Sequence, residues 1–192
     1  IDNSGPFLAM NPFSSRCCQH NHAQGWPYYS EHLILATPDN GAAIALYAAC
    51  KATLKVADGQ EITLHEQTNY PFEEKISFTV NTTEDVRFPF YLRIPAWCDQ
   101  PELAINGKQK KIDPIPGKYI YIDRTWTDGD KVELNLPMKL SIRTWQVNKN
   151  SVSVNYGPLT LSLKINEEYI QKDSRSTAIY DSRWQEGANA TQ

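Results

Sequence analysis

The feature that most constrains the fold is a series of short segments after residue 41 in which apolar and polar residues alternate. Successive side chains of a strand point to opposite faces, so this alternation is typical of strands with one buried face. Gly, Pro and Asn separate about ten such segments at intervals of roughly ten residues. The predicted strands cover residues 43–47, 53–56, 61–68, 75–80, 88–94, 103–105, 119–122, 131–136, 140–145, 151–154 and 159–163. No helix-length connection separates them, which predicts an antiparallel β-sandwich over residues 41–165.

The residues on either side of this region have different patterns. A helix over about residues 22–35 is predicted, with Pro27 in its first turn and the turn at residues 38–41 as its end. Its apolar residues recur at three- and four-residue steps, at Trp26, Tyr29, Leu33 and Ala36. A single helix must bury its apolar face against another element. Residues 166–192 are polar and lack periodicity, so we expect an extended tail or the beginning of a further domain.

Composition excludes several classes of partner. The formal net charge is −3, which gives no electrostatic reason to expect nucleic acid or an anionic membrane surface. No apolar run approaches the ~20 residues that a membrane-spanning helix needs. No signal peptide is recognisable, and the chain begins with Ile1 rather than Met. We therefore expect a processed product or an excised piece of a longer protein, without nucleic acid or a membrane as partner.

The string Cys17-Cys18-Gln19-His20-Asn21-His22 combines the residue types that zinc prefers. One interpretation is a local zinc site made of Cys17, Cys18, His20 and His22. Adjacent side chains diverge on both helices and strands, so two neighbouring cysteines share one ion only where the backbone makes an irregular turn.

Two other interpretations of this string stay open. A thiolate nucleophile could have its pKa lowered by a metal or by Arg16. Alternatively, both thiols are buried and inert. Adjacent cysteines rarely bridge each other, so a Cys17–Cys18 disulfide is not expected. Disulfide bridges from this pair to Cys50 and Cys98 are conceivable.

Aromatic and acidic residues of the predicted sandwich raise further possibilities. Trp97, Trp126 and Trp145 could form a platform on which sugar rings stack, but filling the core is the favoured interpretation. Glu73 and Glu74 are adjacent, so on an extended chain they point to opposite faces. They cannot form the facing carboxylate pair of a glycosidase unaided.

Longer strings carry a resemblance to a known family. They are NYPFEEKISF at residues 69–78, FYLRIPAWC at 90–98, INGK at 105–108, PGKY at 116–119, WTDGDKV at 126–132, LPM at 136–138 and YGPL at 156–159. Together with the Cys-Cys pair and Asn21, they resemble the C-terminal half of glycoside hydrolase family 127, the β-L-arabinofuranosidase group once labelled DUF1680. The resemblance extends from about residue 13 to residue 165.

This resemblance implies a domain organisation and a site. Residues 1–40 would be the C-terminal remnant of an (α/α)6 catalytic barrel, residues 41–165 the following β-sandwich, and residues 166–192 the tail. In the family, a glutamate and three cysteines hold a zinc ion, and the adjacent pair corresponds to Cys17 and Cys18. The first of the pair is the nucleophile, which makes Cys17 the candidate. A separate glutamate acts as general acid and base in a retaining reaction on a carbohydrate substrate.

The sequence departs from the family in two respects. The family commonly has Cys-Cys-Pro-Pro-Asn where this chain has Cys-Cys-Gln-His-Asn, so specificity for β-L-arabinofuranose is not simply transferred. The acid/base glutamate and the remaining zinc ligands are expected upstream of Ile1. We therefore expect the isolated chain to be inactive, its zinc site to be incomplete, and the parent protein to act on plant or bacterial glycans. The alternative is a non-catalytic carbohydrate-binding or structural sandwich.

Overall fold

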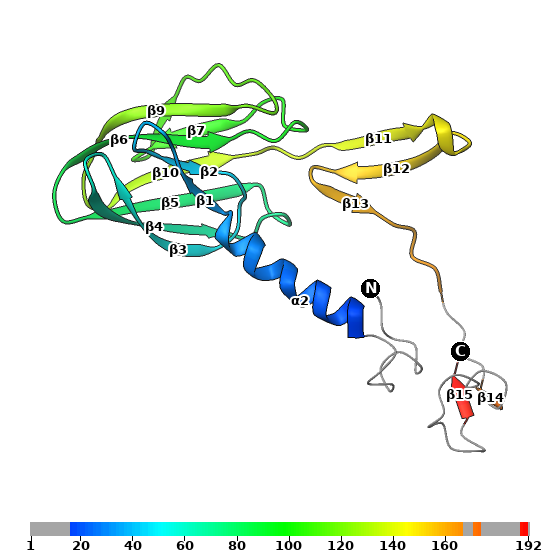
Figure 1. The fold of residues 1–192 in the computed structure, drawn as a ribbon. Coiled ribbons are helices and arrows are strands. Elements are labelled where there is room, and N and C mark those ends of the chain that lie inside the picture. Colours follow the sequence, from blue (N-terminus) through cyan, green and yellow to red (C-terminus); the bar gives the residue numbers. More distant parts are fainter. Residues whose placement is uncertain (1–15, 167–170, 174–188, 192) are drawn as a thin grey trace. The chain divides into compact units, whose positions relative to one another are not determined.

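The computed structural model describes residues 16–166, 171–173 and 189–191, and the side chains of residues 21–166. The chain divides into two compact units, and Figure 1 shows its helix and strands. The first comprises Ile1–Tyr29 and Leu163–Gln192, and the second comprises Ser30–Ser162. Within the described residues, no helix is both long enough and apolar enough to cross a membrane.

Two sheets form a sandwich in the second unit. The four-stranded sheet has the order β1-β2-β6-β9, and the six-stranded sheet has the order β3-β4-β5-β10-β7-β8. The strands of the first are β1 (Ile34–Ala36), β2 (Ala42–Ile44), β6 (Val86–Arg93) and β9 (Tyr119–Trp126). Those of the second are β3 (Cys50–Val56), β4 (Gln60–Thr68), β5 (Lys75–Thr82), β7 (Glu102–Ile105), β8 (Lys108–Lys110) and β10 (Asp130–Asn135). The predicted mainly-β sandwich is thus confirmed.

Among the described strands, every pair is antiparallel as predicted, with one exception. β2 runs parallel to β6, with Ala42 opposite Phe90 and Ile44 opposite Leu92. A parallel pair needs a long crossover connection. Here the chain between β2 and β6 passes through β3, β4 and β5 of the other sheet, which lets it return in the same direction.

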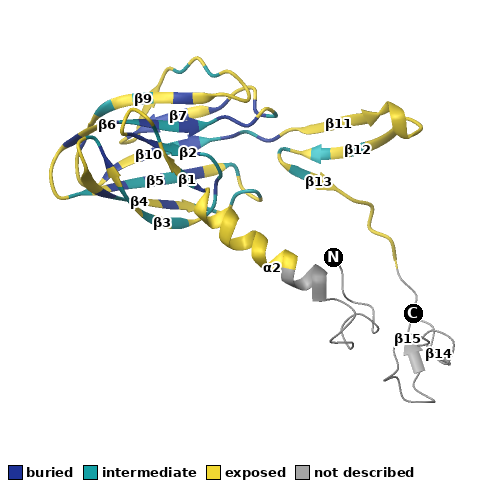
Figure 2. Ribbon diagram, in the orientation of Figure 1, coloured by how far each residue is buried: buried dark blue, intermediate teal, exposed yellow. Residues whose placement is uncertain are grey.

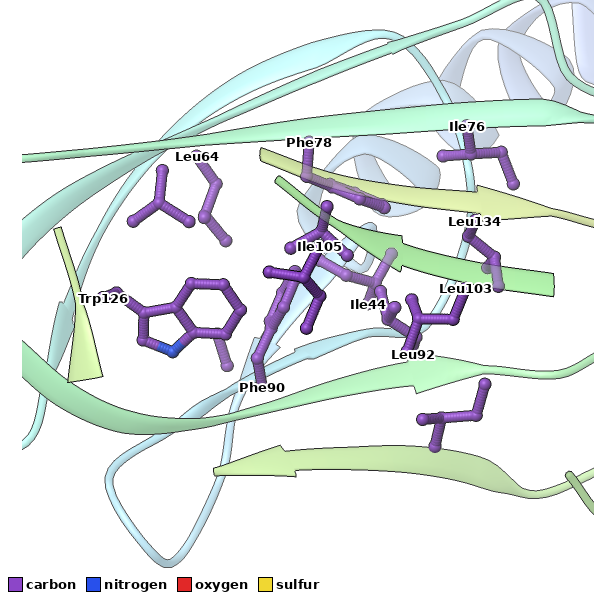
Figure 3. Close-up of a cluster of buried hydrophobic side chains, with 14 of the residues drawn as sticks. Ile44, Leu64, Ile76, Phe78, Phe90, Leu92, Leu103, Ile105, Trp126 and Leu134 are labelled. Atoms are coloured by element: carbon purple, nitrogen blue, oxygen red, sulfur yellow. The ribbon is translucent and has the colours of Figure 1, made fainter. Parts of the chain in front are cut away.

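The core follows from the alternation seen in the sequence. On β4, β5, β6 and β10 every second residue is buried, and these residues face one another between the sheets (Figure 3). Trp126 at the end of β9 is fully buried, and its indole Nε1 donates a 3.0 Å hydrogen bond to the carbonyl oxygen of Phe88. The Trp126 ring also meets Phe90 edge to face at 5.7 Å. A buried indole whose N–H is satisfied contributes a large apolar surface without a polar penalty.

Three strands that the sequence assigned to the sandwich form a sheet of their own. They are β11 (Leu140–Trp145), β12 (Ser151–Tyr156) and β13 (Leu159–Leu161), with the 3-10 helix η1 (Gln146–Asn148) in the first hairpin. Every residue of β11 is exposed, and Figure 2 shows β12 and β13 in a mixture of the exposed and intermediate colours, with no buried residue. Alternation therefore identified the strands but not the sheet to which they belong, because register with a partner depends on tertiary contacts.

The helix is displaced relative to its predicted position. Helix α2 spans Arg16–Glu31, so Pro27 lies inside it rather than in its first turn. Ile34–Ala36, expected at the end of the helix, is strand β1. β1 pairs with β2, Ile34 lying opposite Ile44, and this pairing supplies backbone hydrogen bonds that override the weak helical periodicity.

The C-terminal region contains two further short strands. β14 (Gln171–Asp173) pairs antiparallel with β15 (Asn189–Thr191). The rest of the tail predicted for residues 166–192 lies outside the described residues.

Candidate functional site

The cysteine pair lies at the beginning of helix α2. Cys17 and Cys18 are its second and third residues, and their backbone is helical. Their side chains, with that of His20, lie outside the part of the chain whose side chains the structure describes. The assignment of Cys17 as nucleophile and of Cys17 and Cys18 as zinc ligands therefore stays a prediction.

The helical backbone of α2 disfavours the local zinc site made of Cys17, Cys18, His20 and His22. Successive helical residues are about 100° apart around the axis, so these four positions are distributed around the helix rather than on one side. The irregular turn that this interpretation required is not the backbone conformation of Arg16–Glu31. His22 is exposed, and its ring meets Trp26 edge to face at 5.9 Å.

Within the described side chains, Cys50 and Cys98 complete neither a metal site nor a disulfide. Cys50 and Cys98 are free thiols, so neither forms the conceivable bridge to the Cys17–Cys18 pair. Over the described residues, no group of three or more His, Cys, Asp or Glu side chains is placed to hold a metal ion.

The sandwich nevertheless contains a buried carboxyl group, Glu66. It lies on β4 in the row of inward-facing residues and is only 1% exposed. Its Oε1 accepts a 3.1 Å hydrogen bond from the backbone N–H of Ala48, and its Oε2 lies 3.9 Å from the thiol of Cys50. Burial raises the pKa of Glu66 to about 8, so this side chain carries a proton at neutral pH.

The pKa values of two neighbours of Glu66 are raised as well. Burial, together with Glu66, raises the pKa of Cys50 to about 11 and raises that of Tyr47 well above its usual value. Tyr47 donates a 2.5 Å hydrogen bond to the carbonyl oxygen of Arg93. All three groups are therefore neutral at pH 7, so the half-buried Cys50 thiol beside Glu66 is not an activated nucleophile.

A second polar cluster fixes the turn that leads from β9 in one sheet to β10 in the other. Asp130 is 5% exposed and accepts hydrogen bonds from Asn106 Nδ2 at 2.6 Å and from the backbone N–H of Thr127 at 3.0 Å. Arg124 completes the cluster with an ion pair at 3.2 Å. Because the partners come from the end of β9, from the turn itself and from the β7–β8 turn, the arrangement is structural.

The tryptophans and glutamates singled out in the sequence lie in different environments. Trp126 fills the core as expected, Trp97 is half-buried against it, and Trp145 is 41% exposed under the Arg143 guanidinium. Glu73 is exposed, whereas Glu74 Oε1 accepts a 2.7 Å hydrogen bond from the backbone N–H of Met138. The tryptophans form no common platform, and the glutamates form no catalytic pair.

The structure reveals an aromatic surface that the sequence argument missed. Tyr91, Tyr119 and Tyr121 lie on the outward-facing rows of β6 and β9, next to Asp39. The signal was present, because tyrosine stands at strand positions where alternation predicts polar residues. Recognising this surface requires knowing that β6 and β9 are neighbours in the sheet. The sequence does not show this, because β9 lies far from β6 along the chain.

Comparison with known proteins identifies relatives of this sandwich. Residues 41–138 match the family model described as β-L-arabinofuranosidase, GH127 middle domain. A crystal structure of Ara127N-Se, a GH127 β-L-arabinofuranosidase from Geobacillus stearothermophilus T6, is 30% identical with a TM-score of 0.69, covering 75% of this chain and 23% of that one. A structure described as a glycoside hydrolase is 28% identical with a TM-score of 0.70, covering 80% of this chain and 26% of that one.

A third similar structure, the GH127 β-arabinofuranosidase BT3674, is 27% identical with a TM-score of 0.57 and covers 65% of this chain and 22% of that one. Comparison with curated protein sequences gives no match. The chain thus spans about a quarter of the length of the structures that it resembles. The predicted family is confirmed: this chain belongs to glycoside hydrolase family 127, and its β-sandwich is the GH127 middle domain.

Proposed function

We propose that this chain is part of a retaining glycoside hydrolase that acts on arabinofuranose-containing plant or bacterial glycans. The observation that carries the proposal is the match of residues 41–138 to the GH127 middle domain. The Cys17–Cys18 pair, which precedes this domain in α2, supports it, because the resemblance assigns the nucleophile to this pair.

The proposed reaction consists of two displacements at the anomeric carbon. The Cys17 thiolate attacks C1, the glycosidic C–O bond breaks, and a glutamate from elsewhere in the protein gives its proton to the leaving oxygen. Water then attacks C1, the C–S bond breaks, and the same glutamate accepts the proton of the water. Two inversions restore the original configuration, which accounts for a retaining outcome.

Zinc fits the chemistry of the two proposed ligands. Thiolates are preferred zinc ligands, and Cys17 and Cys18 would supply two of the about four that the ion needs. When bound, zinc keeps a thiolate deprotonated at neutral pH. The described residues contain no further cluster of ligands, so we propose that the others come from outside the described part of the chain.

Two protein forms test this proposal: residues 1–192 and the full-length parent protein. We expect residues 1–192 to bind zinc weakly, because two thiolates without partners do not complete a tetrahedral site. In the parent, Cys18→Ala is expected to lose metal and activity together, as measured by zinc content and hydrolysis of an aryl β-L-arabinofuranoside. Tight stoichiometric zinc in residues 1–192 that is lost with His20→Ala and His22→Ala would instead support the local zinc site.

The second candidate function is carbohydrate binding by the sandwich. The observation in its favour is the exposed tyrosine surface of the four-stranded sheet, where Tyr121 is 56% and Tyr119 44% exposed. This function does not compete with catalysis elsewhere in the protein.

A further inference from the structure

The two outer faces of the sandwich differ in chemistry. Apart from Ala104, the outward-facing residues of the six-stranded sheet are charged or polar, as in an ordinary solvated face; they include Lys51, Glu61, His65, Lys75, Lys131 and Glu133. The outward rows of the four-stranded sheet combine Leu35, Ala43, Pro89, Tyr91, Tyr119 and Tyr121 with the charged or polar residues Arg87, Arg93, Asp123 and Thr125. A one-sided concentration of apolar and aromatic residues on an exposed sheet marks a contact surface.

The tyrosines form one compact group. Tyr91 on β6 lies directly opposite Tyr121 on β9, with ring centroids 5.1 Å apart, and its ring meets Tyr119 edge to face at 6.5 Å. These rings stand on paired strands of a packed sheet, so few rotamers are lost when a ligand covers them. Rigid aromatic rings provide large contact area at low entropic cost.

Polar groups are fixed at two places on the same face. Tyr91 donates a 2.5 Å hydrogen bond to Asp39 Oδ2, and Thr37 donates to the other carboxylate oxygen. These two hydroxyls lower the pKa of Asp39, which therefore stays ionised at neutral pH. Beside Tyr121, Arg87 holds Asp123 by two hydrogen bonds of 3.2 and 2.9 Å. Both carboxylates keep acceptor capacity for incoming hydroxyl groups.

The surface is hollowed beside these tyrosines. A depression of about 550 Å³ is lined by residues 35–39, Ala43, Tyr91 and Tyr119. A second of about 610 Å³ has Tyr121 and Asp123 on its rim, but its lining includes the inward-facing Ile105, Ile120 and Ile122, so it opens between the two sheets at the β9 edge. Tyr91 lines the first depression and Tyr121 the second, and their two rings are tilted by 53° to each other. Each has the volume of a small-ligand site, which is about 300–1,000 Å³.

We propose that this face, defined by Asp39, Tyr91, Tyr119, Tyr121 and Asp123, binds an oligosaccharide. Sugar rings present flat C–H faces that pack on aromatic rings, and edges of hydroxyl groups that donate to carboxylates. Tyr119 and Tyr121 follow each other along the outward row of β9, so successive sugar units of a chain can contact different rings. A docking protein would be matched by a continuous apolar core, whereas here ionised carboxylates interrupt the aromatic surface.

The carbohydrate class follows from the chemistry of this surface, whereas arabinofuranose as its particular sugar rests on the proposed function. Two probes separate these points: a short arabinofuranose oligosaccharide and a xylo-oligosaccharide of equal length. Titration calorimetry on residues 1–192 measures affinity without any requirement for catalysis. We expect saturable binding of at least one probe, weakened at least about tenfold by Tyr121→Ala and by Tyr119→Ala.

A matched control and a conservative variant sharpen the test. Tyr156→Ala removes a tyrosine that is 37% exposed on β12, outside the proposed face, and is expected to leave the affinity unchanged. Tyr121→Phe keeps the ring and is expected to retain most of the affinity. Xylo-oligosaccharide binding that Tyr121→Ala abolishes supports the face even where the arabinofuranosidase function fails.

Three results would overturn the proposal. The first is that neither probe binds. The second is that the wild type, Tyr119→Ala and Tyr121→Ala bind equally well. The third is that the chain self-associates, that Tyr121→Ala abolishes this self-association, and that neither sugar binds. The last outcome would assign the face to a second copy of the chain. Circular dichroism of each variant excludes unfolding as the cause of lost binding.

Discussion

The carboxyl group of Glu66 and the thiol of Cys50 face each other inside the sandwich, with Oε2 and Sγ 3.9 Å apart. They stand on adjacent strands, directly opposite in the β3–β4 register. No charged side chain is hydrogen-bonded to Glu66 among the described residues, so the core retains its carboxyl group in the protonated form.

This burial predicts a pH-dependent stability. Burial raises the pKa of Glu66 from 4.5 to about 8, so the folded protein holds a proton that the unfolded chain releases. The resulting stabilisation is complete below pH 4.5 and is lost as the pH rises through about 8. The free energy of unfolding should fall by up to roughly 1.4 kcal/mol per pH unit in this window. Urea denaturation between pH 5 and 9 measures this slope.

The variant Glu66→Gln should flatten that dependence, because an amide keeps the acceptor for Ala48 N–H and does not ionise. The control Glu61→Gln changes an exposed glutamate on the same strand and should leave the slope as it is. An unchanged slope in Glu66→Gln would show that another group titrates instead.

Trp126 should be the most costly tryptophan to remove. It is fully buried against Phe88 and Phe90, and its N–H is hydrogen-bonded. Trp126→Ala should lower the free energy of unfolding by about 3–5 kcal/mol, the usual cost of a large aromatic cavity. Trp145→Ala, at an exposed site, should cost far less. Thermal and chemical denaturation compare the two, and equal losses would contradict this assignment of the core.

Gly41 should tolerate no side chain. A Cβ atom there would lie 2.2 Å from the carbonyl oxygen of Pro89, where β2 meets β6. Gly41→Ala should therefore destabilise the sandwich by about 1–3 kcal/mol or more, because backbone must move to make room. A β-turn glycine with open space around it, Gly129, provides the comparison. There, Ala should cost only the strain of a φ near +80°. Denaturation curves of both variants measure the change in the free energy of unfolding. An unchanged free energy of unfolding in Gly41→Ala would refute the close approach of the backbone to Gly41.

The alternation of residues predicted most of the strands, because one buried face per strand leaves a local signature. It did not predict β1 or β8, which are three residues long and depend on a partner strand. Nor did it reveal the parallel β2–β6 pair, since strand direction follows from the path of the chain between the sheets. The separate β11–β13 sheet was hidden for the same reason.

The two candidate sites differ in how they were found. Cys17 and Cys18 were predicted from adjacency and resemblance, and their chemistry rests on groups outside the described side chains. The Tyr91–Tyr121 surface combines strands separated by residues 94–118, so only the sheet order brings it together. Glu66 was invisible as a buried acid, because a glutamate on an alternating strand is ordinarily solvent-facing.

The most direct test of the central claim is kcat/KM of the full-length protein on an aryl β-L-arabinofuranoside, with and without Cys17→Ala. We predict a loss of at least about 10³-fold, since without the thiolate the first displacement has no nucleophile. Cys50→Ser, which keeps a donor beside Glu66, should leave the rate unchanged. Full activity of the folded Cys17→Ala protein would contradict the assignment of the nucleophile.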